Sequence, residues 1–183
     1  KNKKILNIYL ADLANDLFEI DNKSIPIGIG FVGAYCKGTF VSNVNIKLFR
    51  TAKPLLEEIM REPAHIIGFG SYDWNYNLTL KAAWKIKKIF PESIVVMGGA
   101  NVDIDPEENK NFLEQNPYVD LLVSGDGEKP FAKIAQFYLE LDNEKAIREK
   151  IKSTPIAGVR SLYKGKLVMG EASDTEESLD TIP

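Results

Sequence analysis

Short apolar runs alternate with amphipathic segments along most of the chain. The runs cover residues 5–10, 44–49, 65–69, 94–97 and 119–123. Continuous apolar runs of this length, bounded by turn residues, are typical of strands buried on both faces of a parallel sheet. The pattern therefore predicts five buried strands.

The segments between the runs space their apolar residues three and four positions apart, as one face of a helix requires. The expected faces are Gly28, Phe31, Val32 and Tyr35; Leu55, Leu56, Ile59 and Met60; Ala82, Ala83, Ile86, Ile89 and Phe90; and Phe131, Ile134, Ala135 and Tyr138. A weaker helix over residues 106–115 is anchored by Phe112 and Leu113. This alternation predicts an α/β fold: a three-layer, Rossmann-like (flavodoxin-like) doubly wound parallel sheet of five strands.

The pattern changes after Leu141. Residues 142–152 form a charged helical stretch, and GVRSLYKGKLVMG predicts a small C-terminal β-hairpin around Lys164 and Gly165. The final EASDTEESLDTIP is acidic and poor in apolar residues, which is typical of a linker. We expect a core domain over 1–141, a helix-and-hairpin appendage over 142–171 and a linker over 172–183.

Composition narrows the partners and the compartment. The net charge of -3 is spread without a basic stripe, so no nucleic-acid partner is expected. No apolar stretch approaches the roughly 20 residues that span a bilayer, so no membrane partner is expected. The single cysteine, Cys36, excludes an internal disulfide and fits a reducing cytosol. These features predict a soluble, cytoplasmic protein.

Ligands of doubly wound sheets bind beyond the carboxyl ends of the strands, so the loops at that edge are the candidate site. The third strand runs into GFGSYDWNYN, whose candidate contacts are Ser71, Tyr72, Asp73, Trp74 and Asn75. Aromatic rings interleaved with amides and a carboxylate can hold a planar, amphipathic ligand. Alternatively, Trp74 and Tyr76 cover the core while Asn75 or Asn77 caps the next helix.

Glycines mark the other loops at this edge. The first helix starts near Pro26, and Gly28 follows it; the pair either begins an ordinary helix or lets a ligand approach closely. After the fourth strand, Gly98 and Gly99 precede Ala100 and Asn101 and either make a turn or clear space on the sheet.

The loop after the fifth strand reads SGDGEKPF. Gly125 and Gly127 permit a tight turn, and Glu128 suits the start of a helix. A phosphate cradle is disfavoured because Asp126 and Glu128 would repel the phosphate, and the phosphate-binding fingerprints are absent. This loop therefore forms either a helix start or one wall of a groove.

The sequence offers no candidate catalytic or metal-ligating residue. His65 begins the third strand, at the edge opposite the predicted site, where a structural role is expected. Cys36 falls inside the first helix and is expected to be a small core residue. No nucleophile elbow, zinc pattern or histidine base is present, so this chain alone is not expected to catalyse a reaction.

Five stretches together resemble one family. They are SIPIGIGFVGAYCKG, HIIGFGSYDWN, VVMGGANVDIDPEE, DLLVSGDGEKPF and the terminal SLDTIP. In this order and spacing, they resemble the cobalamin-binding N-terminal domain of cobalamin-dependent radical SAM enzymes. The match departs from the family pattern at Ala100 and Asn101, which replace the end of its GGPH segment, and at Asp126, which replaces the first glutamate of GEGE.

The resemblance implies cobalamin as the cofactor of this domain. Its tail would lie near Ser71, Tyr72, Gly98 and Gly99, and its corrin face over the loops of Pro26, Trp74, Asn101 and Gly127. The full set of implied contacts is Pro26, Gly28, Ser71, Tyr72, Asp73, Trp74, Asn75, Gly98, Gly99, Ala100, Asn101, Gly125, Gly127 and Glu128. Related cobalamin domains carry D-x-H-x-x-G after the first strand; aligned on Asp12, the histidine falls at Ala14 and the last glycine at Leu17. The implied binding mode therefore lacks a histidine ligand.

One cysteine cannot supply C-x-x-x-C-x-x-C, so a 4Fe-4S cluster and S-adenosylmethionine are expected only in a downstream radical SAM domain. That domain is the implied intramolecular partner. Two alternatives remain open. Asp12, Asp73 and Lys129 resemble the pocket of a receiver-like phosphoacceptor domain, although their spacing is wrong for it. The second alternative is a degenerate module that keeps the fold as a scaffold and binds no cofactor.

Overall fold

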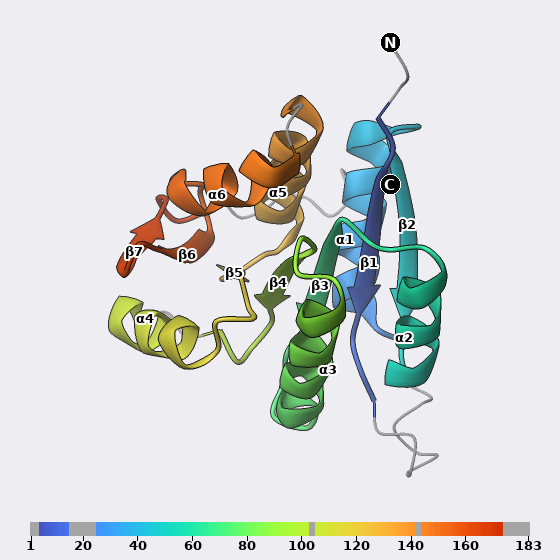
Figure 1. Cartoon of the computed structure of the whole chain (residues 1–183), viewed down its shortest axis with the longest axis horizontal. Coiled ribbons are helices and arrows are strands. Elements are labelled where there is room, and N and C mark those ends of the chain that lie inside the picture. The colour runs from blue at the N-terminus through green and yellow to red at the C-terminus, as the bar shows by residue number, and fades with distance from the viewer. Residues whose placement is uncertain (1–3, 15–24, 103–104, 142–143, 174–183) are drawn as a thin grey trace.

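The computed structural model describes residues 4–14, 25–102, 105–141 and 144–173. Strands and helices alternate through most of this range (Figure 1). The elements in chain order are β1 (Leu6–Ala11), α1 (Ile27–Phe40), β2 (Val44–Phe49), α2 (Ala52–Arg61), β3 (Ile66–Gly70), α3 (Tyr76–Ile89), β4 (Ile94–Gly98), α4 (Pro106–Gln115), β5 (Leu121–Val123), α5 (Glu128–Glu140), α6 (Glu144–Ser153), β6 (Val159–Tyr163) and β7 (Lys166–Met169).

The strands form one seven-stranded sheet in the order β2-β1-β3-β4-β5-β6-β7. The first five are parallel, which confirms the predicted doubly wound sheet, and their order is the flavodoxin-like one. The chain reverses direction across the sheet between β1 and β3, so this is the topological switch point. The C-terminal hairpin extends the same sheet, because β6 pairs antiparallel with β5 and β7 pairs antiparallel with β6.

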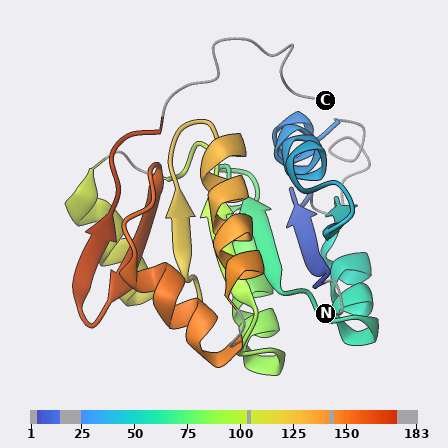
Figure 2. The ribbon, with the colours of Figure 1, turned by 90° about the horizontal axis from the view of Figure 1, so that it is seen from above.

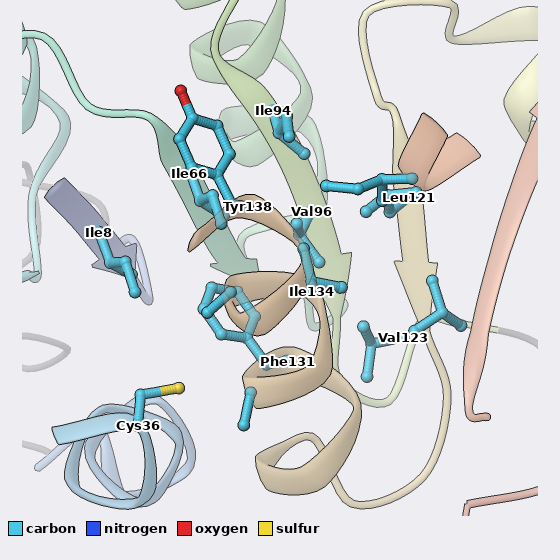
Figure 3. Packing of buried hydrophobic residues seen from close by; sticks show 14 of the residues in the cluster. Ile8, Cys36, Ile66, Ile94, Val96, Leu121, Val123, Phe131, Ile134 and Tyr138 are labelled. Carbon is cyan, nitrogen blue, oxygen red and sulfur yellow. The ribbon is translucent and has the colours of Figure 1, made fainter. Parts of the chain in front are cut away.

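Each face of the sheet has its own apolar core. One core joins the strands to α1, α5 and α6, and the other joins them to α2, α3 and α4. Figure 2 shows α5 and α6 in front of the sheet. Adjacent strand residues alternate between the cores: Val95 belongs to the second and Val96 to the first. Figure 3 shows Phe131 and Ile134 of α5 against the strands that carry Ile66 and Val96.

The expected burial is wrong for strand β2 and for part of helix α1. Strand β2 is not buried on both faces, because it lies at the edge of the sheet and its side chains are mostly half-buried. Helix α1 buries Ile29, Gly33 and Cys36, whereas Phe31 of the expected face is exposed. A Cβ at Gly33 would lie 3.4 Å from Leu10 Cδ1, so this glycine brings the helix close to the sheet and sets which face is buried.

Met60 and Ile89, both expected on buried helix faces, are exposed. Each lies near the C-terminal end of its helix, in α2 and α3 respectively. Their spacing satisfies the helical pattern, but the side chains that α2 and α3 bury near these ends are those of Ile59 and Ile86. By contrast, α4 covers the predicted 106–115, with Leu113 buried and Phe112 half-buried against the second core.

A buried ionic cluster joins the two helical layers, and nothing in the sequence pattern indicated it. The carboxylate of Asp120 is fully buried just before β5. It pairs with Lys87 Nζ of α3 at 2.6 Å and with Arg148 Nε of α6 at 2.6 Å, and it accepts a hydrogen bond from Val95 N at 2.9 Å. Lys87 Nζ also donates to the carbonyl of Ser93. Burial lowers the pKa of Lys87, and the neighbouring Asp120 carboxylate opposes that effect.

Candidate functional site

Three glycines cut a notch into one face of the sheet at its carboxyl edge. In the register, Leu10 of β1, Gly68 of β3 and Val96 of β4 form one row across the strands. Gly70 and Gly98 pair in the next row toward the edge. Side chains two residues apart on a strand point to the same face, so both rows face α1 and α5.

The two rows differ in depth. A Cβ at Gly68 would lie 2.7 Å from Leu10 Cδ2 and 2.8 Å from Phe131 Cε2, so those two side chains close the inner end of the notch. A Cβ at Gly98 would meet nothing nearer than the Val123 carbonyl oxygen at 3.5 Å. The outer row is therefore open, and a side chain there would occupy the notch.

The notch opens into a cavity of about 210 Å³ between the sheet, α1 and α5. Its apolar walls include Leu10, Ile29, Val96, Val123 and Phe131. Of the predicted contacts, the residues that line it are Gly28, Tyr72, Gly98, Gly99, Gly125, Gly127 and Glu128. The cavity lies at the switch point between β1 and β3, where doubly wound sheets bind their ligands.

Seven predicted contacts do not line this cavity: Pro26, Ser71, Asp73, Trp74, Asn75, Ala100 and Asn101. Pro26 directly precedes α1, and Asp73 is exposed. Sequence reasoning missed the apolar wall and Gly68, Gly70 and Asp126. The two strand glycines spaced by two residues were a usable signal, since that spacing places both on one face of the sheet.

Ser71 and Gly99 join the loops that follow β3 and β4. Gly99 has a φ of 97°, and a Cβ there would lie 2.7 Å from the carbonyl oxygen of Ser71. Ser71 N donates to Gly98 O at 2.7 Å, and Asn101 N donates to Ser71 O at 3.2 Å. Ser71 itself is fully buried. These contacts make Ser71 and Gly99 the support of the cavity rim.

The loop after β3 presents two stacked aromatic rings. Tyr72 and Trp74 lie 4.6 Å apart between ring centroids with an interplanar angle of 4°. Tyr72 also lies over α1, because a Cβ at Gly28 would be 3.4 Å from its hydroxyl oxygen. The Trp74 side chain is 70% exposed. The alternative in which Trp74 covers the core is therefore wrong, and its indole is available to a ligand above the cavity.

Asn75 holds this aromatic loop in place from below. Its side chain is 1% exposed. Its Oδ1 accepts from Tyr72 N at 2.8 Å, and its Nδ2 donates to Gly70 O and to Asp12 Oδ1, each at 3.1 Å. Asn75 occupies the N-cap position of α3 but makes no capping hydrogen bond with its side chain. The expected helix cap is therefore replaced by a brace within the loop.

Asp12 connects that brace to the opposite side of the switch point. Its Oδ2 pairs with Arg50 Nη1 at 3.0 Å, and the same Nη1 donates to Asp12 O at 2.9 Å. Burial raises the pKa of Asp12 above its usual value of 3.8, while Arg50 and the Asn75 hydrogen bond partly oppose the increase. Burial raises the pKa of the neighbouring Tyr72 hydroxyl, and the Asp12 carboxylate raises that pKa further.

This arrangement predicts an acid-range signature in stability. A carboxyl group whose pKa is raised by folding stabilises the folded state at low pH, and that stabilisation is lost as pH rises through the folded pKa. The unfolding free energy of the wild type minus that of Asp12→Asn should therefore fall as pH rises from about 3.8. Urea unfolding at a series of pH values measures it.

Arg50→Gln is the control for this prediction. Removing the guanidinium removes an opposing influence, so the pKa of Asp12 should rise further and the loss of stability should extend to higher pH. A difference between wild type and Asp12→Asn that is flat with pH would contradict the prediction.

No histidine lies near the cavity in the described part of the chain. Ala14, at the aligned histidine position, is buried. His65 lies at the opposite end of β3, where its Nδ1 accepts from Asn7 N at 2.9 Å and its ring packs edge-on against Tyr138. Its expected structural role is confirmed. Cys36 is buried as expected, and burial raises the pKa of its thiol to about 12.

The residues present suit a flat, largely apolar group better than a bare metal ion. Within the described ranges, no three His, Cys, Asp or Glu side chains are grouped so that they could hold a metal. The apolar wall and the glycine notch instead enclose a space of about 210 Å³, and the stacked rings of Tyr72 and Trp74 belong to the loop after β3. Of the helices that the structure describes, none is long and apolar enough to cross a membrane.

Residues 16–135 match the family model described as "B12 binding domain". This chain therefore belongs to the B12-binding domain family. That confirms the predicted resemblance to cobalamin-binding domains and cobalamin as the expected cofactor. Which individual residues contact the cofactor stays a prediction.

Two curated relatives each match 69 residues of this chain. The cobalamin-dependent radical SAM methyltransferase TokK of Streptomyces tokunonensis is 36% identical over its match, and the 2-(S-pantetheinyl)-carbapenam-3-carboxylate methyltransferase of Streptantibioticus cattleyicolor is 35% identical over its own. Each match covers 38% of this chain and 10% of the relative.

Among solved structures, the cobalamin-dependent S-adenosylmethionine radical enzyme OxsB with aqua-cobalamin and S-adenosylmethionine bound matches 93% of this chain and 23% of its own, with a TM-score of 0.69 and 17% identity. Its apo form matches with a TM-score of 0.65 and 15% identity. At this identity, the likeness establishes a shared fold.

Proposed function

We propose that this chain is the cobalamin-binding module of a radical SAM enzyme and presents a corrinoid without a histidine ligand to a radical SAM domain of the same protein. The observation that carries the proposal is the glycine-cleared apolar cavity at the β1/β3 switch point, with Ala14 where related domains have a histidine. The B12-binding family of the chain supports it, as does its similarity to TokK and OxsB, which are both cobalamin-dependent radical SAM enzymes.

In this proposal the cavity would hold the nucleotide tail of the cofactor, and the loops at its rim would hold the corrin ring. Gly28, Gly98 and Gly127 would leave space for the tail. Trp74 would offer its exposed indole to the ring, and the Asn75 brace holds that loop without a ligand. When bound, cobalamin supplies a cobalt centre for methyl transfer or radical chemistry. This chain's own part is to orient the group and keep water from its lower face.

The remaining parts of such an enzyme lie outside this chain. Its single cysteine cannot build the three-cysteine site of a 4Fe-4S cluster, so the cluster and S-adenosylmethionine would bind another domain. The chain spans about a tenth of the curated relatives it matches, which leaves ample length in such proteins for that domain. A reducing, cytoplasmic compartment fits both a cluster and the buried free thiol of Cys36.

The test is direct binding by the intact protein. After incubation with hydroxocobalamin and gel filtration, corrin absorbance should co-elute with the protein in about equimolar amount. The spectrum should be that of cobalamin with neither its own base nor a histidine on cobalt. His65→Gln, which alters the only histidine of the chain, should leave that spectrum unchanged.

Failure of corrin to co-elute at saturating hydroxocobalamin would overturn the proposed function. A spectrum that changes in His65→Gln, with binding retained, would instead overturn the histidine-free mode alone.

A further inference from the structure

The polar and apolar parts of the cavity are separated by depth. Its inner wall consists of Leu10, Ile29, Val96, Val123 and Phe131, all buried members of the first core. Among the described residues that line it, the side chains with polar atoms are Tyr72, Asp126 and Glu128. Tyr72 and Asp126 lie in loops at the mouth and Glu128 begins α5, so none of the three lies on the strand face that forms the floor.

The backbone of the floor is also committed to other partners. Gly68 pairs between Leu10 and Val96 in the parallel ladder, and Gly98 O accepts from Ser71 N at 2.7 Å. Ladder hydrogen bonds use the strand N-H and C=O groups within the plane of the sheet, so they do not point into the cavity. A group inserted to the floor therefore meets mainly the side chains of Leu10, Val96 and Phe131, and the nearest backbone oxygen beside Gly98 is the Val123 carbonyl.

The size of the cavity suits a fused pair of rings. A dry apolar cavity of about 150 Å³ holds one benzene ring, and this one has about 210 Å³. Natural corrinoids end their nucleotide tail in bicyclic bases of similar outline, among them dimethylbenzimidazole and adenine. The two bases are too similar in shape for the cavity to distinguish them by size. Any preference for one base must therefore come from the chemistry of the inner wall.

The two bases differ at the ring that is remote from the ribose. In dimethylbenzimidazole that ring is a benzene carrying two methyl groups, whereas in adenine it carries two ring nitrogens and an exocyclic amine. Polar groups buried without hydrogen-bond partners lose their hydration uncompensated. Methyl groups against Leu10, Val96 and Phe131 gain by leaving water.

We infer that this cavity selects corrinoids by their lower base, accepting dimethylbenzimidazole and discriminating against adenine. The inference rests on the proposed function, since it concerns the same site. Discrimination by an apolar pocket against added polar groups is limited, so the expected preference is about 10-fold to 100-fold in Kd.

The experiment compares two corrinoids with the same corrin ring and upper ligand: cyanocobalamin and its adenine-containing analogue. Equilibrium dialysis against the intact protein gives both Kd values, with bound cobalt counted directly. The wild type should bind cyanocobalamin at least about tenfold more tightly. Equal Kd values would overturn the inference and leave the proposed function standing, whereas binding of neither corrinoid would overturn both.

A matched pair of variants tests whether the apolar inner wall of the cavity causes the preference for dimethylbenzimidazole. Val96→Thr places a hydroxyl on the cavity face of β4, whereas Val95→Thr places the same group on the opposite face, at similar burial. Val96→Thr should narrow the preference for dimethylbenzimidazole, because adenine gains a partner. Val95→Thr should keep it. Circular dichroism establishes that both variants are folded, and equal preferences in the two would contradict the role of the wall.

Discussion

Gly28→Leu is expected to lower the affinity for cobalamin by about 100-fold or more, which corresponds to about 2.8 kcal/mol. Gly28 lies in the first turn of α1 and lines the cavity, and a Cβ there would already be 3.4 Å from the hydroxyl oxygen of Tyr72. A leucine at this position extends into the space proposed for the nucleotide tail. Isothermal titration or equilibrium dialysis with hydroxocobalamin measures the loss.

Gly30→Leu provides the matched control. Gly30 lies two residues further along the same helix, and a Cβ there would meet nothing within 4 Å. Both substitutions remove a glycine from a helix and so favour the helix by a similar amount. Gly30→Leu should bind cobalamin like the wild type. Equal affinity of the two variants would show that the tail does not pass Gly28.

Asp120→Ala is expected to lower the free energy of unfolding by about 3–5 kcal/mol. The substitution leaves Lys87, itself largely buried, without its carboxylate partner, and it removes the link to Arg148. It also leaves Val95 N without the hydrogen bond that Asp120 accepts. For a domain with a total stability of about 5–15 kcal/mol, this is a large fraction. Urea unfolding followed by circular dichroism measures it.

The control removes a carboxylate of the same charge from the surface. Glu114 of α4 pairs with Lys110 at 4.0 Å, and both side chains are solvent-accessible. Exposed pairs contribute at most about 1 kcal/mol, so Glu114→Ala should change stability little. If Asp120→Ala cost no more than Glu114→Ala, the buried cluster would not hold the helical layers together.

The strands and helices could be predicted because the spacing of apolar residues and the residues at helix starts are local features of the sequence. The predicted bounds of α4 agree with the observed ones, and the start of this helix is encoded locally: Pro106 occupies the first turn and Asp105 Oδ1 accepts from Glu107 N at 2.7 Å. The buried face of α1 could not be predicted in the same way. Its apolar residues surround the helix, and Gly33, which meets Leu10 across the interface, decided the rotation.

The position of the site followed from topology, but its chemistry did not. Once parallel strands were predicted, the loops at their carboxyl ends were the candidates, and Gly28, Tyr72 and Gly98 indeed line one cavity. Val96 and Val95 look alike in the sequence, yet one faces the cavity and the other faces away. The burial of Ser71, which is fully buried beneath the rim, was likewise not visible in the sequence.

The stretch SGDGEKPF also shows which features the sequence predicts and which need the tertiary structure. Its acidic residues disfavour a phosphate cradle, and the predicted helix start is observed, since Gly127 directly precedes α5 and Glu128 begins it. That Asp126 also lines the cavity became visible only when β5 was placed beside β4.

The sequence by itself determined the alternation of strands and helices, the parallel sheet, the edge that carries the site and the absence of a histidine at position 14. These follow from side-chain period and local backbone preference, which neighbouring residues encode. Only the tertiary structure decided which apolar residues wall the cavity, how Asn75 and Asp12 brace the aromatic loop, and how Asp120 joins two layers. Those features depend on contacts between residues far apart in the chain, such as Asp12 and Asn75, which are 63 positions apart, and no local pattern records such contacts.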